Sequence, residues 1–329
     1  TGGTGGIFLA NTGALTVGGI GAVTSVTATG AITISASSPY TQAINMTSAA
    51  AITLTAGETN DGPAYADDLT VNAGVTVQSS LAAVGGTAVT LNAGDDVVIG
   101  GTVVATAADG IVVVTAGFGA QDTVPAGSIT DANGSLVNVV APTVTLSAVG
   151  VTGGIDLDLT ATAVTATVTG AGAIDLSDSA GGLTIGAAGV STADGNITVN
   201  ATGGTLTVSG SVTAGGAGAN VNLSTTGTGN IAINAGVITA ADDVVTLNAV
   251  GTIDGSDAGN DITAGSLSAT AGTGIDIDTT ITTLTALVTG AGAIDVSDSA
   301  GGMNVLSAVT QGVGTITLSA TGGNLALGT

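Results

Sequence analysis

Pairs of aspartates are the residues of this chain that could do chemistry. One pair stands two residues apart, a second pair three residues apart, and both return 120 residues later. Paired carboxylates can act as acid and base in glycoside hydrolysis, and their oxygens are ligands that Ca²⁺ prefers. A catalytic pair is usually unique in its chain, so this recurrence favours a structural or cation-binding role. The candidate metal-binding residues are Asp156, Asp158, Asp175, Asp178, Asp276, Asp278, Asp295 and Asp298.

Other catalytic groups are missing. The 329 residues include no Lys, Arg, His or Cys, so a serine nucleophile has no base to activate it and a lyase has no cation. Aromatic side chains that could hold a sugar are limited to Phe8, Tyr40, Tyr65 and Phe118. We therefore predict that the chain is not an enzyme and carries no organic cofactor.

Calcium is the cofactor that the charge favours. The run from Gly170 to Asp175 has one residue more between its last Gly and the Asp than the Gly-Gly-x-Gly-x-Asp motif of calcium-binding β-rolls, and no nine-residue period follows it. A chain with 23 acidic residues and a net charge of −23 should nevertheless attract divalent cations. Two alternatives stay open: ordered Ca²⁺ at stacked corners, or aspartates that cap turns under diffuse counterions. The second is favoured.

The same charge excludes classes of partner. Phosphate recognition depends on Lys and Arg, so nucleic acid is excluded and anionic membrane surfaces are disfavoured. No apolar run approaches the roughly 18 residues that a membrane-spanning helix needs. We expect no membrane insertion.

Short apolar–Thr–apolar triplets are the elements that must position the aspartates. Ile32-Thr33-Ile34, Ile52-Thr53-Leu54 and Ile197-Thr198-Val199 are examples, and turn residues separate them. In a strand the two apolar residues face one way and Thr the other. Three such strands of three to five residues would make one coil of about 22–24 residues, and so about 15 coils. The sequence predicts an all-β chain folded as a right-handed parallel β-helix, or β-solenoid, with about three short strands per coil.

A longer repeat overlies the coils. Residues 164–182 and 284–302 are identical at 16 of 19 positions, an offset of 120. We interpret residues 1–329 as a single solenoid in which a module of about 120 residues repeats, at about 144–263 and, incompletely, 264–329. Residues 39–68 hold two prolines and two tyrosines, and we expect an irregular, loop-bearing segment there.

Several segments together resemble a family. Val144-Thr145-Leu146-Ser147-Ala148, Gly153-Gly154-Ile155-Asp156-Leu157 and Ala180-Gly181-Gly182-Leu183-Thr184 are similar to the repeat regions of filamentous-haemagglutinin-like giant adhesins. The resemblance implies a right-handed β-helical shaft exported to the bacterial cell surface. The start has no Met and no signal segment, so we expect a piece of something longer.

These observations predict an extracellular structural or adhesive rod of a large secreted surface protein. Its expected partners are further coils, through end-to-end or lateral self-association or continuation of the same chain, and cell-surface glycans. The alternative is a cation-stabilised β-helix that binds, or less readily cleaves, carbohydrate.

Threonine and asparagine patterns raise two further hypotheses. Thr27-Ala28-Thr29 and Thr165-Ala166-Thr167 would suit an ice-binding face, but such a face needs equivalent pairs on every coil, and the spacing of Thr pairs along the chain varies. Asn200, Asn222, Asn234 and Asn248 follow strands and could form a ladder of stacked amides.

Overall fold

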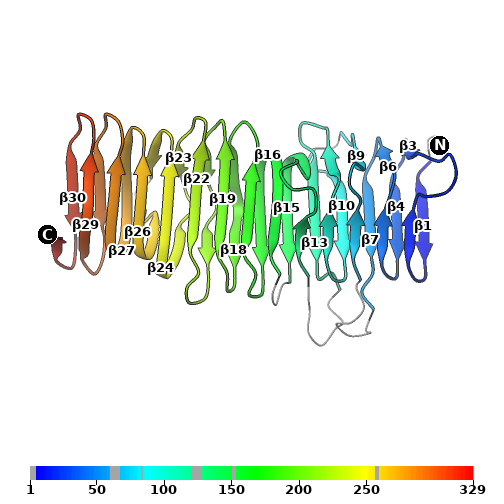
Figure 1. Cartoon of the computed structure of the whole chain (residues 1–329), viewed down its shortest axis with the longest axis horizontal. Helices are drawn as coiled ribbons and strands as arrows, with labels where there is room; N and C mark the ends of the chain where they lie inside the picture. The colour runs from blue at the N-terminus through cyan, green and yellow to red at the C-terminus, as the bar shows by residue number, and fades with distance from the viewer. Residues whose placement is uncertain are drawn as a thin grey trace. The chain divides into compact units, whose positions relative to one another are not determined.

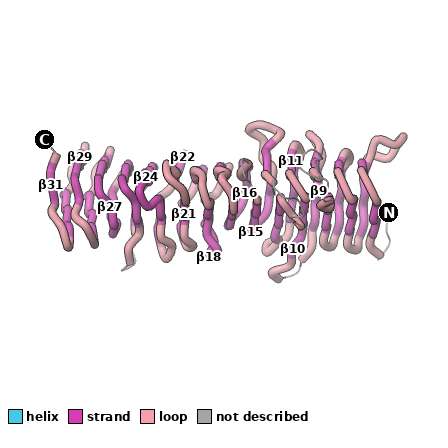
Figure 2. Tube along the Cα trace, turned by 90° about the horizontal axis from the view of Figure 1, so that it is seen from below, coloured by secondary structure: helices cyan, strands magenta, loops and turns pink. Residues whose placement is uncertain are grey.

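Every regular element of the described chain is a β-strand. The computed structural model describes residues 5–59, 67–82, 84–119, 127–149, 153–255 and 259–328. Contacts divide the chain into two compact units, Thr1–Gly172 and Ala173–Thr329, here the first and second units. Parallel strands stack as a β-solenoid of about 13 turns, which confirms the predicted all-β solenoid, with fewer turns than expected. Strands and loops alternate along the trace (Figure 2). In the described part, no helix is long and apolar enough to span a membrane.

Three columns of parallel strands build the first unit (Figure 1). The first column holds β1 (Ile7–Asn11), β4 (Ile32–Ala36), β7 (Ile52–Ala56), β10 (Thr87–Ala93) and β13 (Ile111–Ala116). The second column holds β2 (Leu15–Val17), β5 (Tyr40–Gln42), β8 (Leu69–Val71), β11 (Val97–Ile99) and β14 (Ile129–Asp131). The third column holds β3 (Ser25–Ala28), β6 (Asn45–Ser48), β9 (Thr76–Ser79) and β12 (Thr102–Ala105). Strand β15 (Val139–Ala148) runs from the third column into the first, and β16 (Ile155–Val168) from the second through the third into the first.

Three columns also build the second unit. The fourth column holds β17 (Ile174–Asp178), β19 (Ile197–Thr202), β22 (Val221–Thr226), the ends of β24 (Ile238–Ala249), β26 (Ile262–Ala271) and β27 (Gly274–Val288), then β29 (Met303–Thr310) and β31 (Leu325–Leu327). The fifth column holds the start of β18 (Leu183–Thr192), β20 (Leu206–Val208), β23 (Ile231–Ile233), β25 (Thr252–Asp254), the start of β27, β28 (Ile294–Asp298) and β30 (Ile316–Ala320). The sixth column holds the end of β18, β21 (Val212–Ala214) and the starts of β24 and β26.

Aliphatic ladders form the core, as the triplets predicted. In β4 the residues Ile32 and Ile34 are buried while Thr33 between them is half-exposed. Each inward residue stacks on its equivalent one coil away, so that apolar area leaves water along the whole ladder. One ladder of the first column consists of Ile32, Ile52, Val89, Val112, Val144 and Val164.

Coil length varies more than the period indicated. Ile197, Val221 and Val245 pair in succession and keep the expected coil length. By contrast the chain returns to the same ladder much sooner between Leu267 and Leu284, which are also paired neighbours. The prediction of uniformly short strands is wrong for β16, of 14 residues, and β27, of 15. Their sequences contain no Gly, Asn or Pro after the first residue, so pairing continues through the corners.

Two predictions about organisation stay predictions. The expected loop-bearing segment 39–68 contains β5, β6 and β7, while residues 60–66 lie outside the described residues. The 120-residue module places β17 and β28 at equivalent positions, and in each strand the first, third and fifth residues are buried.

The predicted asparagine ladder is wrong. Asn200 and Asn248 both pair with Ser224, and Asn222 pairs with Thr198 and Thr246. The amides therefore alternate with hydroxyls; Ser224 Oγ donates to Asn200 Oδ1 at 3.0 Å.

Candidate functional site

Strand parity separates the eight candidate aspartates into two sets. Residues two apart share a face of a strand, whereas residues three apart face opposite ways. The outward set is Asp156, Asp158, Asp175, Asp276, Asp278 and Asp295. Asp178 and Asp298 face the core instead, and they are 0% and 2% exposed. The carboxylates of Asp175 and Asp178, and of Asp295 and Asp298, therefore do not form pairs.

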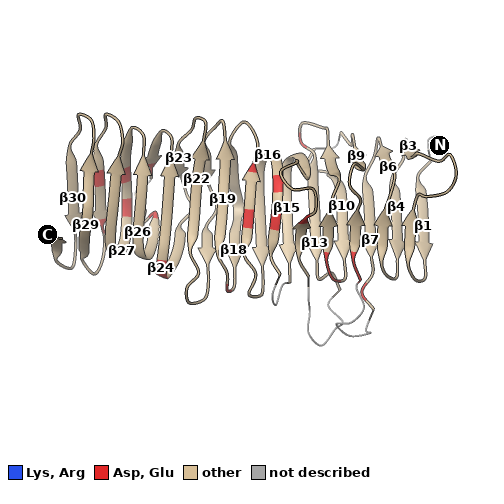
Figure 3. Cartoon of the chain, in the orientation of Figure 1, with Lys and Arg blue, Asp and Glu red and all other residues tan. Residues whose placement is uncertain are grey.

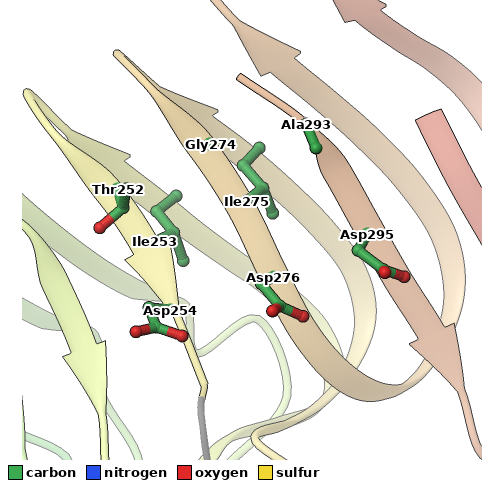
Figure 4. A pocket seen from close by; sticks show the side chains of 8 residues that line it. All are labelled: Thr252, Ile253, Asp254, Gly274, Ile275, Asp276, Ala293 and Asp295. Atoms are coloured by element: carbon green, nitrogen blue, oxygen red, sulfur yellow. The ribbon is translucent and has the colours of Figure 1, made fainter. Parts of the chain in front are cut away.

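Three outward carboxylates form a row across the fifth column. Asp276 pairs with Asp254 on one side and with Asp295 on the other. Figure 4 shows the three side chains side by side on neighbouring strands. Neighbouring strands are about 4.8 Å apart, so the carboxylates repel one another. We call these three residues the aspartate row.

Small residues make a shallow groove beside the aspartate row. Thr252, Gly274 and Ala293 precede the row by two residues on each strand and so share its face. The groove has a volume of about 310 Å³. Its lining residues include carboxylates and small side chains but no aromatic ring, so it offers charge and space without a stacking surface.

The central carboxyl of the row, Asp276, has a perturbed proton affinity. Partial burial raises the pKa of Asp276, and the charges of Asp295, Asp254 and Asp278 raise it further. Desolvation also raises the pKa of Asp175 on β17. Asp276 thus holds its proton more tightly than an ordinary carboxyl group, as a general acid or a strained surface charge would.

Asp276→Asn should raise the melting temperature at neutral pH, because the folded state carries an ionised carboxylate that its neighbours disfavour. The raised pKa means that the folded chain binds this proton more tightly than the unfolded chain. The free energy of unfolding of the unmodified chain therefore rises as pH falls through the raised pKa, and this contribution is complete below the ordinary value of 3.8. Thermal melts across roughly pH 3–8 check this.

The advantage of Asp276→Asn should disappear near about pH 3, where the wild-type carboxyl is itself neutral. Asp276→Glu, which keeps a carboxylate at the same position, is the matched control and should show no such gain. A gain that persists unchanged at acid pH would contradict the electrostatic explanation.

Buried aspartates brace the corners of the coils. Asp298 Oδ1 accepts a hydrogen bond from the backbone N–H of Ile281 at 3.0 Å, one coil earlier. Asp261, which the sequence did not single out, accepts from the N–H of Asp278 at 2.8 Å. Asn138 does the same for the N–H of Asp158 at 2.8 Å. These inward polar side chains satisfy backbone groups that the corners leave unpaired.

A second group of carboxylates lies at a corner of the first unit. Asp95 Oδ2 accepts from the N–H of Asp67 at 3.1 Å, and Asp68 Oδ1 from the N–H of Asp96 at 3.1 Å. Asp96 Oδ1 accepts from the N–H of Ser128 at 2.7 Å. Burial, together with the charges of Asp96, Asp95 and Asp67, raises the pKa of Asp68, while its bond from Asp96 N–H opposes the shift. These carboxylates connect one coil to the next.

Metal binding stays a prediction. Among the described residues, no three or more carboxylates gather closely enough to hold one ion between them. The carboxylate oxygens of the aspartate row are one coil apart. This spacing suits a hydrated cation that bridges two carboxylates better than a cation coordinated directly on all sides by protein oxygens.

The aromatic side chains are not gathered at a site. Tyr40 is fully buried, and its hydroxyl donates to Gln42 Oε1 at 2.5 Å, so it is inaccessible to a sugar. Phe8 and Phe118 are exposed but belong to the first unit, whereas the groove belongs to the second. Tyr65 lies outside the described residues.

Sequence reasoning missed one member of the aspartate row. Asp254 lies outside the closely matched repeat, yet it follows Ile253 as Asp276 follows Ile275 and Asp295 follows Ile294. The recurring Ile-Asp dipeptide was the available signal.

Comparison with known proteins identifies no relative. No family model matches the chain, and no curated protein or solved structure is significantly similar to it. The fold and the geometry of its surfaces therefore carry the functional argument.

Proposed function

We propose that the chain is a segment of an extracellular structural or adhesive rod, part of a large secreted bacterial surface protein of the filamentous-haemagglutinin-like type. Its role is mechanical and not catalytic. The observation that supports the proposal is the β-solenoid itself, in which the inward apolar side chains of each coil are buried on those of the next.

The last coil of the second unit is uncapped. Leu284, Val305 and Leu327 form one inward ladder, and their exposed fractions are 0%, 5% and 71%. In the described part, β31 pairs with β29 on one side and offers an unpaired edge on the other. An apolar hollow of about 440 Å³ lies there, lined by Val305, Leu306, Leu325 and neighbours. An unpaired parallel edge over an open core accepts another strand of the same kind.

The first coil of the first unit has the same character. In the described chain β1 pairs only with β4, and Leu9, whose partner Ile34 is buried, is 45% exposed. Burying such surface stabilises by about 25 cal/mol per Å². Coils therefore add favourably at either edge, from further chain or from a second copy.

Assembly in solution tests the proposal. At rising concentration the full chain should form linear filaments, observed by electron cryomicroscopy and light scattering. Leu327→Asp puts a charge into the open core ladder and should abolish end-to-end growth. Leu136→Asp changes a similarly exposed leucine in a turn of the first unit and should leave growth unchanged. Each sample is measured in EDTA and in millimolar Ca²⁺.

The outcomes separate the alternatives. Filaments that lose order in EDTA would add ordered Ca²⁺ to the proposal. A chain that stays monomeric under every condition, or a Leu327→Asp variant that assembles like wild type, would contradict end-to-end growth.

Carbohydrate contact is the second candidate. The groove beside the aspartate row and the raised pKa of Asp276 favour it, because glycoside chemistry needs a carboxyl group that holds its proton and a second carboxylate nearby. The lining has no aromatic ring, so we rank it below the structural role. Glycan-array binding that Asp276→Asn removes would reverse this order.

A further inference from the structure

One face of the first unit is an ordered array in which ten of twelve members carry a hydroxyl group, the others being Val113 and Asn92. It consists of two outward positions, two residues apart, on each first-column strand from β4 onward, in two files; Ile111 and Thr87 are outward neighbours that lie beside it. We call it the hydroxyl array. Its members are Thr33, Thr53, Thr90, Val113, Thr145 and Thr165 in one file, and Ser35, Thr55, Asn92, Thr115, Ser147 and Thr167 in the other.

Register along the hydroxyl array is unbroken. Every member pairs with its equivalent in the next coil, and no register shift falls between members. Along the chain, however, Thr53 lies much further from Thr90 than from Thr33. The extra residues fall outside β7 and β10, since both strands keep their array members two residues apart and in register. The uneven spacing of Thr pairs along the sequence therefore comes from loops of different length. It does not mean that the pairs are unevenly spaced on this face.

The members of the hydroxyl array have regular spacing and similar exposure. Coils are about 4.8 Å apart, and residues two apart on a strand about 6.6 Å, so the array extends about 24 Å over five coil steps. All members except Thr167 are half-buried, and Thr167 is exposed. Even exposure means that no side chain stands far above its neighbours.

The hydroxyl array is uncharged on a strongly acidic chain. No member is acidic, although the chain carries 23 acidic residues. In Figure 3 the acidic residues near β4, β7, β10 and β13 lie at the ends of these strands and not along them. An ordered face without charge suits a neutral partner with its own repeat.

Array hydroxyls are directed to solvent. Within the described residues the only hydrogen bond among them joins Thr165 Oγ1 to Thr145 Oγ1 at 3.5 Å. Threonine has a restricted χ1 in a strand, so each hydroxyl and methyl is held in a fixed position. Water bound to such hydroxyls is ordered at the spacing of the coils.

We propose that the hydroxyl array binds the surface of ice crystals. Its rows of hydroxyls position water in a repeating pattern, while the methyl groups between them keep that water in cage-like order. The occupant is crystalline water and not a charged macromolecule, because the array has no charged member to pair with one. It is not a sugar polymer, because none of the twelve array members is aromatic.

Partition into slowly growing ice tests the proposal, with thermal hysteresis measured on the same samples. Wild-type chain should be retained in the ice fraction. Thr90→Lys places a long charged side chain at the centre of the hydroxyl array and should reduce retention at least tenfold. The control Thr47→Lys changes an outward threonine of β6 in the third column and should leave retention unchanged. Circular dichroism melts confirm that both variants fold.

Each outcome decides the proposal. Retention that Thr90→Lys loses and Thr47→Lys keeps supports it. Exclusion of wild type from ice, or equal retention by both variants, overturns it. Binding of wild type to microcrystalline cellulose, lost in Thr90→Lys, also overturns it, because a neutral polysaccharide would then be the occupant.

Discussion

Leu284→Ala is expected to lower the free energy of unfolding by about 3 kcal/mol, because it opens a cavity at a fully buried position of its ladder. Leu284 stacks between Leu267 and Val305, so the cavity touches the coils on both sides. Close packing along the ladder limits how far neighbours can collapse into the space. Urea denaturation followed by circular dichroism measures the loss.

Leu287→Ala is the matched control, three residues further along the same strand. Leu287 faces outward and is only half-buried, between Thr270 and Val309. Its loss should cost less than about 1 kcal/mol. If both variants lost a similar free energy of unfolding, the assignment of Leu284 to the inward face and Leu287 to the outward face would be contradicted.

Gly292→Ala is expected to destabilise the second unit by about 3 kcal/mol, through a backbone collision between coils. A Cβ at Gly292 would collide with the carbonyl oxygen of Thr273 in the preceding coil. Backbone cannot rotate aside as a side chain can, so the corner must open. Hydrogen–deuterium exchange should show faster exchange at Gly292 N–H, which donates to Val313 O at 3.1 Å.

Gly301→Ala separates collision from conformational strain. Gly301 has φ of 92°, and a Cβ there would meet nothing within 4 Å. Alanine at this position carries only the left-handed backbone penalty of about 1–2 kcal/mol. A Gly301→Ala variant as unstable as Gly292→Ala would show that φ, and not the close approach of coils, sets the requirement for glycine.

The repeating part of the fold could be predicted from local chemistry. Triplets such as Ile32-Thr33-Ile34 predict which residues face inward, because side chains alternate between the two faces of a strand. Coil length could not be predicted in the same way. The chain from Leu267 to Leu284 closes a short coil only because β27 bends without a turn sequence, which depends on pairing with the next coil.

The candidate site was predictable in part. The outward positions of Asp276 and Asp295 follow from the Ile-Asp dipeptide, but their adjacency depends on the short coil between them. Asp298 was expected to serve a surface site because carboxylates usually face water. Asp298 is separated from Ile294 and Val296 by even numbers of residues, so its side chain faces the core as theirs do. There the backbone N–H of Ile281 donates a hydrogen bond to it.

The corners of the coils differ in length, whereas the strand faces keep their register. This difference determines which insertions and deletions the chain tolerates. The first-column strands β4, β7 and β10 stay in register although the segment joining β7 to β10 is much longer than the one joining β4 to β7. Insertions and deletions between columns therefore leave the faces unaltered. Loop closure costs only about 0.6 kcal/mol for each doubling of loop length. Length polymorphism is thus nearly neutral at these corners, and foreign peptides grafted there would be displayed at fixed intervals on an undisturbed scaffold.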